Sequence, residues 1–497
     1  MKKVIVIGSG FAGMSAASFM AKAGWDVTVL EKHDSPGGRG RKFSANGFTF
    51  DMGPSWYWMP DVFERYFSCF GKKVADYYEL KRLDPSYRIY YADGPVDIPA
   101  DYDELKKLFE SIETGSGAKL DAFLKEAAYK YEVGINKLVY KPGRSVTEFL
   151  DPSLAKGILK LDVFTSMKKH VRKYFTHPKL IQLMEFPVLF LGAMPENIPA
   201  LYSLMNYADI KLGTWYPQGG MFHIADAMYS IAKELGVKFK FEHNVVGITI
   251  EDGMATEVVA DHGSPLTNPP LSIAADVVIG AADYHFIESK LLPESSRTYS
   301  EKYWDKRVMA PSCLLYYIGL NKKLENIQHH SLFFDVDFDQ HGKEIYSSPR
   351  WPTAPLFYVS ATSVTDNSIA PAGCENLFFL VPVATGLTGD TEELREQYFE
   401  KIVKRYEVFT GQVISDSILY KRSYALSDFV EDYNAFKGNA YGLANTLTQT
   451  ALLKPAIKSK KVKNLFYTGQ LTVPGPGVPP SLISGEVVAG EILKEFR

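Results

Sequence analysis

The sequence predicts an α/β protein, and its N-terminal segment gives the main reason. The apolar run Val4-Ile5-Val6-Ile7 is followed by a glycine-rich turn, a helical pattern over 14–23 and a second apolar run over 26–30. Strand, helix and strand in this order are typical of a βαβ unit in a parallel sheet. Further candidate strands lie at 237–241, 245–250, 276–280 and 464–468. We therefore expect the chain to return to the domain of its N-terminal unit at 237–280 and again near residue 464.

Three glycines occupy the turn between the first strand and the helix. Glycine there permits a tight turn, close approach of a pyrophosphate and close packing of helix against strand. The Gly-x-Gly-x-x-Gly pattern is common by chance, so its place directly after a strand makes it informative. A glutamate ends the second strand, where a carboxylate can accept hydrogen bonds from a ribose diol. The sequence therefore predicts a dinucleotide site that includes Gly8, Gly10, Ala12, Gly13, Glu31 and Lys32.

A second glycine cluster, Pro36-Gly37-Gly38-Arg39-Gly40, follows shortly after. A simple NAD site has no need of it, whereas it suits a backbone that passes close to a longer cofactor such as FAD. Arg39 either neutralises a phosphate, lies near the flavin or is a charge on a surface loop. The loop at 50–55 is a further candidate for close approach. FAD is therefore the predicted cofactor, with contacts from Gly38, Arg39, Gly40, Pro54 and Ser55.

Several further segments match one family, in order, along essentially the whole chain. They include Leu83-Asp84-Pro85, Trp215-Tyr216-Pro217-Gln218-Gly219-Gly220-Met221, Asn434-Ala435-Phe436-Lys437-Gly438, and Tyr467-Thr468-Gly469 followed by Pro474-Gly475-Pro476-Gly477-Val478-Pro479. Together with the glycine clusters, they resemble the bacterial phytoene desaturase group of FAD-dependent carotenoid oxidoreductases, which is distantly related to amine oxidases.

The resemblance implies further cofactor contacts. Gly469, Val478 and Pro479 would line the flavin ring and the ribityl chain. The main chain of Val246 would hold the adenine, although Val246 can also be an ordinary strand valine. The chain departs from the family at Gln470, where a small residue is common.

The resemblance also implies a reaction. Two hydrogens would be removed from an acyclic C40 carotenoid, most simply phytoene towards lycopene, with FAD as the acceptor. A hydroxycarotenoid 3,4-desaturase of the same family is the alternative. Phytoene is preferred because a terminal hydroxyl would need a polar partner deep in an apolar tunnel. A redox-neutral carotenoid isomerase and a non-catalytic flavin-bearing scaffold are further alternatives.

A protein base is difficult to identify from the sequence. Glu148 is the first candidate, because Ser145-Val146-Thr147-Glu148 resembles an acidic position in some family members. Ser-x-x-Glu is also a helix capping box, in which Glu148 would only bond its own helix start. Asp51 and Asp209 are weaker candidates.

We expect no metal site. The three cysteines are far apart and contain no Cys-x-x-Cys pair. His329 and His330 are adjacent on an expected strand, so their side chains would point to opposite faces.

Location and partners follow from the lipophilic substrate. Residues 154–173 combine apolar and basic side chains in an amphipathic pattern, which either lies on an anionic leaflet or is a solvated basic face over a core. The apolar run at the N-terminus is too short for a signal peptide, and no run is long enough to span a membrane. We expect a cytoplasmic protein bound peripherally to the inner face of the cell membrane. A net charge of −3 gives no reason to expect nucleic acid.

Three interwoven parts are predicted. A Rossmann-like FAD-binding domain comprises 1–93, 217–299 and 431–497, and a helical part that faces the membrane comprises 94–216. Between 300 and 430, apolar runs at 313–319, 356–360 and 377–383 and a helix at 392–406 indicate a mixed α+β domain that binds the substrate.

Overall fold

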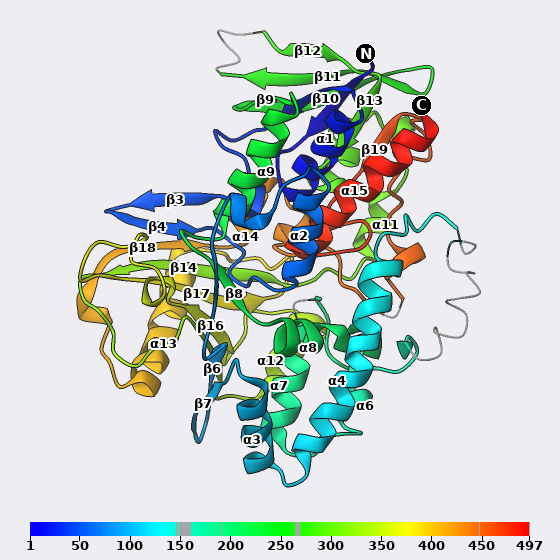
Figure 1. Cartoon of the computed structure of the whole chain (residues 1–497). Helices are drawn as coiled ribbons and strands as arrows, with labels where there is room; N and C mark the ends of the chain where they lie inside the picture. Colours follow the sequence, from blue (N-terminus) through cyan, green and yellow to red (C-terminus); the bar gives the residue numbers. More distant parts are fainter. Residues whose placement is uncertain (146–147, 149–160, 190, 264–268, 447, 497) are drawn as a thin grey trace.

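A computed structural model of the chain describes residues 1–145, 148, 161–189, 191–263, 269–446 and 448–496 (Figure 1). Within this part of the chain, the upper layer in the figure contains a five-stranded sheet in the order β19-β13-β1-β2-β9, with every neighbouring pair parallel. Its strands are β1 (Lys3–Ile7), β2 (Asp26–Leu30), β9 (Lys238–Lys240), β13 (Val277–Gly280) and β19 (Leu465–Tyr467). The predicted α/β fold is therefore confirmed, and the strands near 237–241, 276–280 and 464–468 join this sheet, whereas the predicted strand at 245–250 belongs to a separate antiparallel sheet.

Helix α1 (Phe11–Lys22) follows β1 and packs against the C-terminal helix α15 (Val478–Glu495). The helix begins at Phe11 and not at the predicted residue 14, because the last glycine of the turn already belongs to its first turn. Where the two helices cross, a Cβ added to Gly485 would lie 2.5 Å from the carbonyl oxygen of Ala12 and 2.6 Å from the Cβ of Ser15. Because Gly485 has no side chain, the backbone of α15 can pack directly against Ala12 and Ser15 of α1.

The second layer is a seven-stranded sheet in the order β18-β14-β17-β16-β15-β6-β7, antiparallel except for the β15–β6 pair. Its strands are β6 (Tyr87–Tyr91), β7 (Gly94–Ile98), β14 (Ser312–Leu320), β15 (His330–Phe334), β16 (Phe357–Ser360), β17 (Glu375–Val383) and β18 (Ile418–Tyr424). Strands at the three predicted apolar runs and helix α13 (Glu392–Thr410) agree with the sequence analysis.

Strand β14 is buried along its whole length, and its two faces serve different cores. Leu314 and Tyr316 pack in a cluster with residues of α13. Cys313 and Leu315 project from the opposite face into the larger core that contains the helical part. Because successive side chains of a strand point to opposite faces, a strand covered on both sides requires an unbroken apolar run.

The described residues of 94–216 are largely helical. The helices are α3 (Tyr102–Ile112), α4 (Ser116–Val133), α6 (Met167–Val171), α7 (Pro178–Leu189) and α8 (Leu204–Tyr207). Helices α3, α4, α6 and α7 lie at the foot of Figure 1. The predicted boundary at residue 93 falls inside the β6–β7 hairpin, which pairs with β15 of the 300–430 segment. The hairpin joins that sheet because its first strand is buried on both faces. None of the described helices is long and apolar enough to cross a membrane.

The remaining elements border the two main sheets. A three-stranded antiparallel sheet of β10 (His243–Glu251), β11 (Met254–His262) and β12 (Leu271–Ala274) lies at the outer edge of the upper layer (Figure 1). Helices used in the site are α9 (Phe222–Glu234), α12 (Phe338–Tyr346) and α14 (Leu426–Tyr433).

The contact between α1 and α15 predicts opposite effects for two glycines of one helix. Gly485→Ala places a methyl group against Ala12 and Ser15, so we expect a loss of about 1–3 kcal/mol in the free energy of unfolding. Gly490→Ala is the matched control, because its Cβ would meet no atom within 4 Å. That change should stabilise the helix by up to about 1 kcal/mol. Thermal unfolding of both variants measures this, and equal shifts would contradict the proposed packing.

Candidate functional site

One cavity extends from the glycine turn to the inner face of the seven-stranded sheet. At one end, its walls are the turn after β1, the loops at 37–39 and 53–55, the start of β10 and the start of α15. At the other end they are β14, β16 and β17 of the sheet and helices α7 and α12. We call the first end the cradle and the second end the apolar arm.

The glycine turn closes the cradle. Gly8 has a φ of 101°, in the left-handed region. A Cβ at Gly13 would lie 2.1 Å from the carbonyl oxygen of Gly8, so only glycine lets α1 start this close to β1. A Cβ at Gly10 would meet no atom within 4 Å, so the backbone there borders open cavity. The N-terminus of α1 is therefore presented to the cavity, where its free N–H groups favour an anion.

Glu31 links the end of β2 to this turn. Its Oε2 accepts hydrogen bonds of 2.7 Å from both the backbone N–H and the hydroxyl of Ser9, and its Oε1 accepts one of 3.0 Å from the N–H of His33. These bonds hold the carboxylate at the cavity wall, where lone pairs remain for a ribose diol. The neighbouring ammonium of Lys32 donates to the carbonyl of Glu431, and burial lowers the pKa of Lys32.

Arg39 is the principal cation of the cradle. Its Nη2 donates to the carbonyl of Asn439 at 3.0 Å, and its guanidinium lies over the ring of Tyr433, 5.0 Å from the ring centre. The side-chain oxygen of Gln470, with the amide oriented to satisfy both of its ends, accepts from Arg39 at 3.2 and 3.1 Å. Burial lowers the pKa of Arg39, while the carboxylate of Asp283 opposes that shift. Gln470, which departs from the family pattern, therefore positions this arginine.

Most of the predicted cofactor residues lie together in the cradle. The lining includes Gly8, Gly10, Ala12, Glu31, Lys32, Gly38, Arg39, Pro54, Ser55, Gly469, Val478 and Pro479. Gly13 and Gly40 instead serve packing: a Cβ at Gly40 would lie 2.6 Å from the ring of Phe11. Val246 is 40% exposed, and the wall is formed by Val245 beside it, so the predicted adenine contact of Val246 stays a prediction.

The sequence analysis missed several residues of the cradle. His243 and Asn244 at the start of β10, and Asp432 and Tyr433 at the end of α14, also line it. No short motif marks these positions. Their only sequence signal is that the first pair directly precedes the predicted strand at 245–250.

The apolar arm lies between the inner face of the seven-stranded sheet and two helices. Leu315, Leu332 and Leu380 line it from the sheet, while Phe186 of α7 and Phe338 of α12 line it from the helices. Further apolar residues at its walls are Trp56, Trp58, Leu189, Leu191, Met194, Met205, Phe334, Ile345 and Leu356. Such a lining suits an apolar ligand, which would be held by shape and by exclusion of water.

Three carboxylates were candidates for a protein base, and none lines this cavity within the described chain. Glu148 accepts backbone N–H bonds from Gly143 and Arg144 at 2.9 Å and from Ser145 at 3.0 Å. These bonds are the ones expected if Glu148 belongs to a helix capping box. A catalytic role for Glu148 stays a prediction.

The two weaker candidates are bound to neighbouring donors. Asp51 accepts from the backbone N–H groups of Met221 and Phe222 at the start of α9. Asp209 accepts from the hydroxyls of Tyr87 and Thr214. Burial raises the pKa of Asp51 to about 6 and the pKa of Asp209 to about 7.

The two adjacent histidines are both buried and have different partners. His329 Nδ1 lies 2.8 Å from the hydroxyl of Thr365, and His330 Nδ1 lies 2.7 Å from that of Tyr358. The ring of His330 stacks on Trp56 at 4.1 Å.

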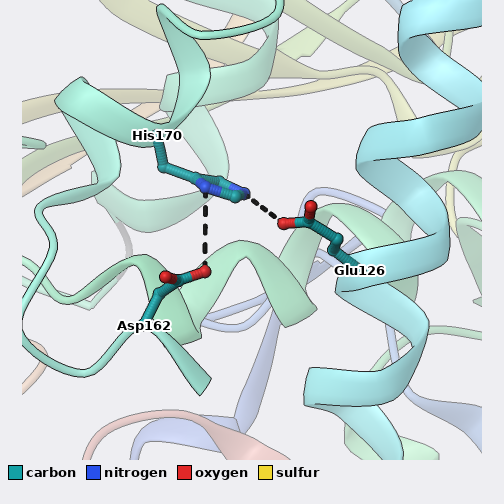
Figure 2. A group of neighbouring side chains, drawn as sticks. All are labelled: Glu126, Asp162 and His170. Carbon is teal, nitrogen blue, oxygen red and sulfur yellow. Dashed lines mark ion pairs between the residues drawn. The ribbon is translucent and has the colours of Figure 1, made fainter. Parts of the chain in front are cut away.

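A separate group of titratable side chains lies in the helical part. Glu126, Asp162 and His170 offer ligand atoms within 4.8 Å of one another, and Figure 2 shows His170 between the two carboxylates. The ammonium of Lys130 lies 2.8 Å from Asp162 Oδ2 and 3.5 Å from His170 Nε2. Burial and the charge of Lys130 lower the pKa of His170 to about 4, so the ring is neutral near pH 7. The protein's own lysine therefore supplies the cation of this group.

The fold and the cradle define a dinucleotide-binding flavoprotein. A profile of the flavin-containing amine oxidoreductases matches residues 11–493. The chain belongs to that family, and FAD is its cofactor.

Two full-length relatives indicate the group within this family that the chain resembles. A carotenoid 3,4-desaturase from Haloarcula japonica is 42% identical over 99% of this chain and 98% of its own. A zeta-carotene-forming phytoene desaturase from Myxococcus xanthus is 31% identical over 99% of this chain and 94% of its own. The resemblance to carotenoid desaturases is therefore confirmed.

Solved structures agree on the fold. An oxidoreductase from Methanosarcina mazei has a TM-score of 0.63 at 16% identity, and covers 98% of this chain and 100% of its own. Putrescine oxidase bound to putrescine has a TM-score of 0.61 at 13% identity, with 99% of both chains covered. At these identities the likeness concerns the fold alone.

The cradle fits FAD on two structural observations. The backbone of Gly10 borders open space at the N-terminus of α1, where a pyrophosphate binds. The Nε of Arg39 is buried and has no hydrogen-bond partner in the described part of the chain, so a donor remains for the cofactor.

The hydrogen bonds of Glu31 predict a test of the cradle. Glu31→Gln removes the negative charge that accepts from Ser9 and faces the ribose position, so the dissociation constant for FAD should rise about ten- to hundredfold. Titration of the apoprotein with FAD, followed by flavin fluorescence, measures it. Glu257→Gln on β11, outside the cavity lining, is the control. Unchanged affinity for Glu31→Gln would show that the carboxylate only holds the turn.

Proposed function

We propose that this protein is an FAD-dependent carotenoid desaturase that introduces the 3,4 double bond of a hydroxylated acyclic carotenoid. The observation that carries the proposal is the single cavity, in which the cofactor cradle opens directly into a long apolar arm. A hydrocarbon chain in the arm would reach the flavin without crossing water. Bound FAD would supply the oxidising chemistry.

The residues of the chain would act by positioning the substrate. Within the described lining, the carboxylates are Glu31, Asp283 and Asp432, all at the cradle end. Asp283 is already bonded to the N–H groups of Phe286 and Phe436. A carotenoid has no acidic proton to remove, so an apolar arm without carboxylates suits shape-based positioning and exclusion of water.

Two observations favour the 3,4-desaturase over phytoene desaturation, which the sequence analysis preferred. The 42% identity to the Haloarcula japonica carotenoid 3,4-desaturase exceeds the 31% identity to the phytoene desaturase. The objection that a terminal hydroxyl lacks a polar partner is also weakened, because tyrosine side chains line the cavity. Phytoene remains the second candidate.

The assay that tests this proposal compares the two substrates. FAD-loaded protein is incubated without oxygen, with either a 1-hydroxylated acyclic carotenoid or phytoene in liposomes, and flavin and carotenoid absorption are followed together. We expect flavin bleaching and a red shift of the carotenoid bands with the hydroxylated substrate, and at least tenfold slower reaction with phytoene.

Each other result selects a different function. Reaction with phytoene alone would make the protein a phytoene desaturase. A spectral change without bleaching would indicate isomerisation, and no change with either substrate would indicate a flavin-bearing scaffold. Liposomes without carotenoid are the control.

We also propose peripheral contact with a membrane, since the substrate is insoluble in water. Of the amphipathic stretch, 154–160 lies outside the described residues. In the described remainder, Leu161 and Met167 are buried, while Phe164 is 91% exposed and Lys169 and Lys173 are exposed. An exposed aromatic side chain near exposed lysines suits an anionic surface.

This surface predicts salt-sensitive binding to vesicles. Phe164→Ser combined with Lys169→Glu and Lys173→Glu should reduce flotation with anionic liposomes, by about 1 kcal/mol per basic residue lost. Lys240→Glu with Lys404→Glu, at exposed positions elsewhere, is the matched control. Equal flotation of the two sets of variants would show that the stretch is only a solvated face.

A further inference from the structure

Two tyrosines offer unused hydrogen-bonding capacity to the cavity. Tyr346 ends helix α12, and Tyr441 precedes Gly442 in the loop after α14. Both line the cavity and are half-buried, and neither hydroxyl has a hydrogen-bond partner in the described part of the chain. Burial raises the pKa of both phenols, so both remain protonated. Each can therefore donate and accept a hydrogen bond.

Two other polar side chains that line the apolar arm, Tyr358 and His341, are already paired. The Tyr358 hydroxyl bonds to Nδ1 of His330 at 2.7 Å. His341 donates from Nε2 to the carbonyl of Pro382 at 2.9 Å, and its Nδ1 accepts from the N–H of Leu356 at 3.0 Å. Among the phenols of the described lining, those of Tyr346 and Tyr441 therefore have hydroxyls available to bind a ligand group.

The two tyrosines lie where the cradle meets the apolar arm. The carbonyl oxygen of Tyr441 accepts a hydrogen bond of 3.2 Å from Gln470, whose other end accepts from Arg39. On the other side, Tyr346 at the end of α12 and Tyr358 of β16 line the same cavity as Tyr441. Tyr346 and Tyr441 therefore lie at the wall of one continuous cavity, with Tyr441 tied to the cofactor end through Gln470.

The chemistry of the substrate requires a polar group at this junction. In a 1-hydroxylated carotenoid, the hydroxyl-bearing carbon is only two carbon–carbon bonds from the 3,4 bond. When that bond reaches the flavin, the hydroxyl must lie beside it, at the cradle end of the arm. The far end of the arm meets only hydrocarbon.

We propose that Tyr441, together with Tyr346 of the same cavity, binds the terminal hydroxyl of the carotenoid and selects hydroxylated chains over hydrocarbons. This inference rests on the function proposed above. In the free protein, water that enters the cavity can satisfy the two phenols. A hydroxylated chain replaces that water with its own donor and acceptor, whereas a hydrocarbon end expels the water and leaves the phenols unpaired. The two tyrosines determine specificity and take no part in hydrogen removal.

The test compares substrates on the FAD-loaded variants Tyr441→Phe and Tyr346→Phe. The ratio of kcat/KM for a 1-hydroxylated carotenoid to that for the matched hydrocarbon should fall about ten- to hundredfold in Tyr441→Phe. Most of the fall should come from slower reaction of the hydroxylated chain. Binding is followed separately through quenching of the fluorescence of Trp56 and Trp58, which line the same cavity.

Tyr406→Phe is the matched control. Its hydroxyl is also buried without a partner in the described chain, but it lies in the α13 cluster on the other face of the sheet. It should leave the ratio unchanged. If both Tyr441→Phe and Tyr346→Phe have normal FAD content and an unchanged ratio of kcat/KM values, the inference about hydroxyl binding is overturned. The proposed desaturase function would not be affected by that result. A wild-type protein that reacts with neither substrate would overturn the proposed function itself, and one that reacts only with the hydrocarbon would overturn hydroxyl recognition.

Discussion

The site depends on one constraint, which is that two other segments of the chain approach helix α1 closely enough to require glycine. At its start, Gly13 lies against the carbonyl of Gly8, and on its side Gly485 of α15 lies against Ala12 and Ser15. The first contact fixes where the helix begins, and the second ties the last helix of the chain to the first. Together they hold the N-terminus of α1 and the start of α15 at the wall of the same cavity. The cofactor site therefore exists only when both ends of the chain have folded.

The cradle could be predicted from the sequence because its signals are local. Gly8, Gly10 and Glu31 follow a spacing set by one strand, one turn and the next strand, and Arg39 lies in a glycine cluster just beyond. Glu148 shows the limit of local patterns, since one tetrapeptide fits both an acid–base residue and a capping box. Only the three N–H groups bonded to its carboxylate show which geometry is present.

The rest of the site could not be predicted because it depends on long-range contacts. Gln470 was noticed only as a departure from a family pattern, yet it connects Arg39 with the loop of Tyr441. Nothing in the sequence near Tyr346 indicates that α12 ends at the same junction. The β6–β7 hairpin was likewise assigned to other parts of the chain, since its pairing with β15 lies far away in sequence.

The two-faced burial of β14 has a consequence for how such proteins can diverge. Leu314 and Tyr316 hold α13 to the sheet, whereas Cys313 and Leu315, which alternate with them in sequence, line the cavity. Substitutions at alternate positions can therefore reshape the cavity while the opposite core keeps its packing. Cavity-lining residues and residues that pack against α13 thus occupy alternate positions of one strand. Natural variation can therefore change the shape of the cavity without weakening the core on the other face.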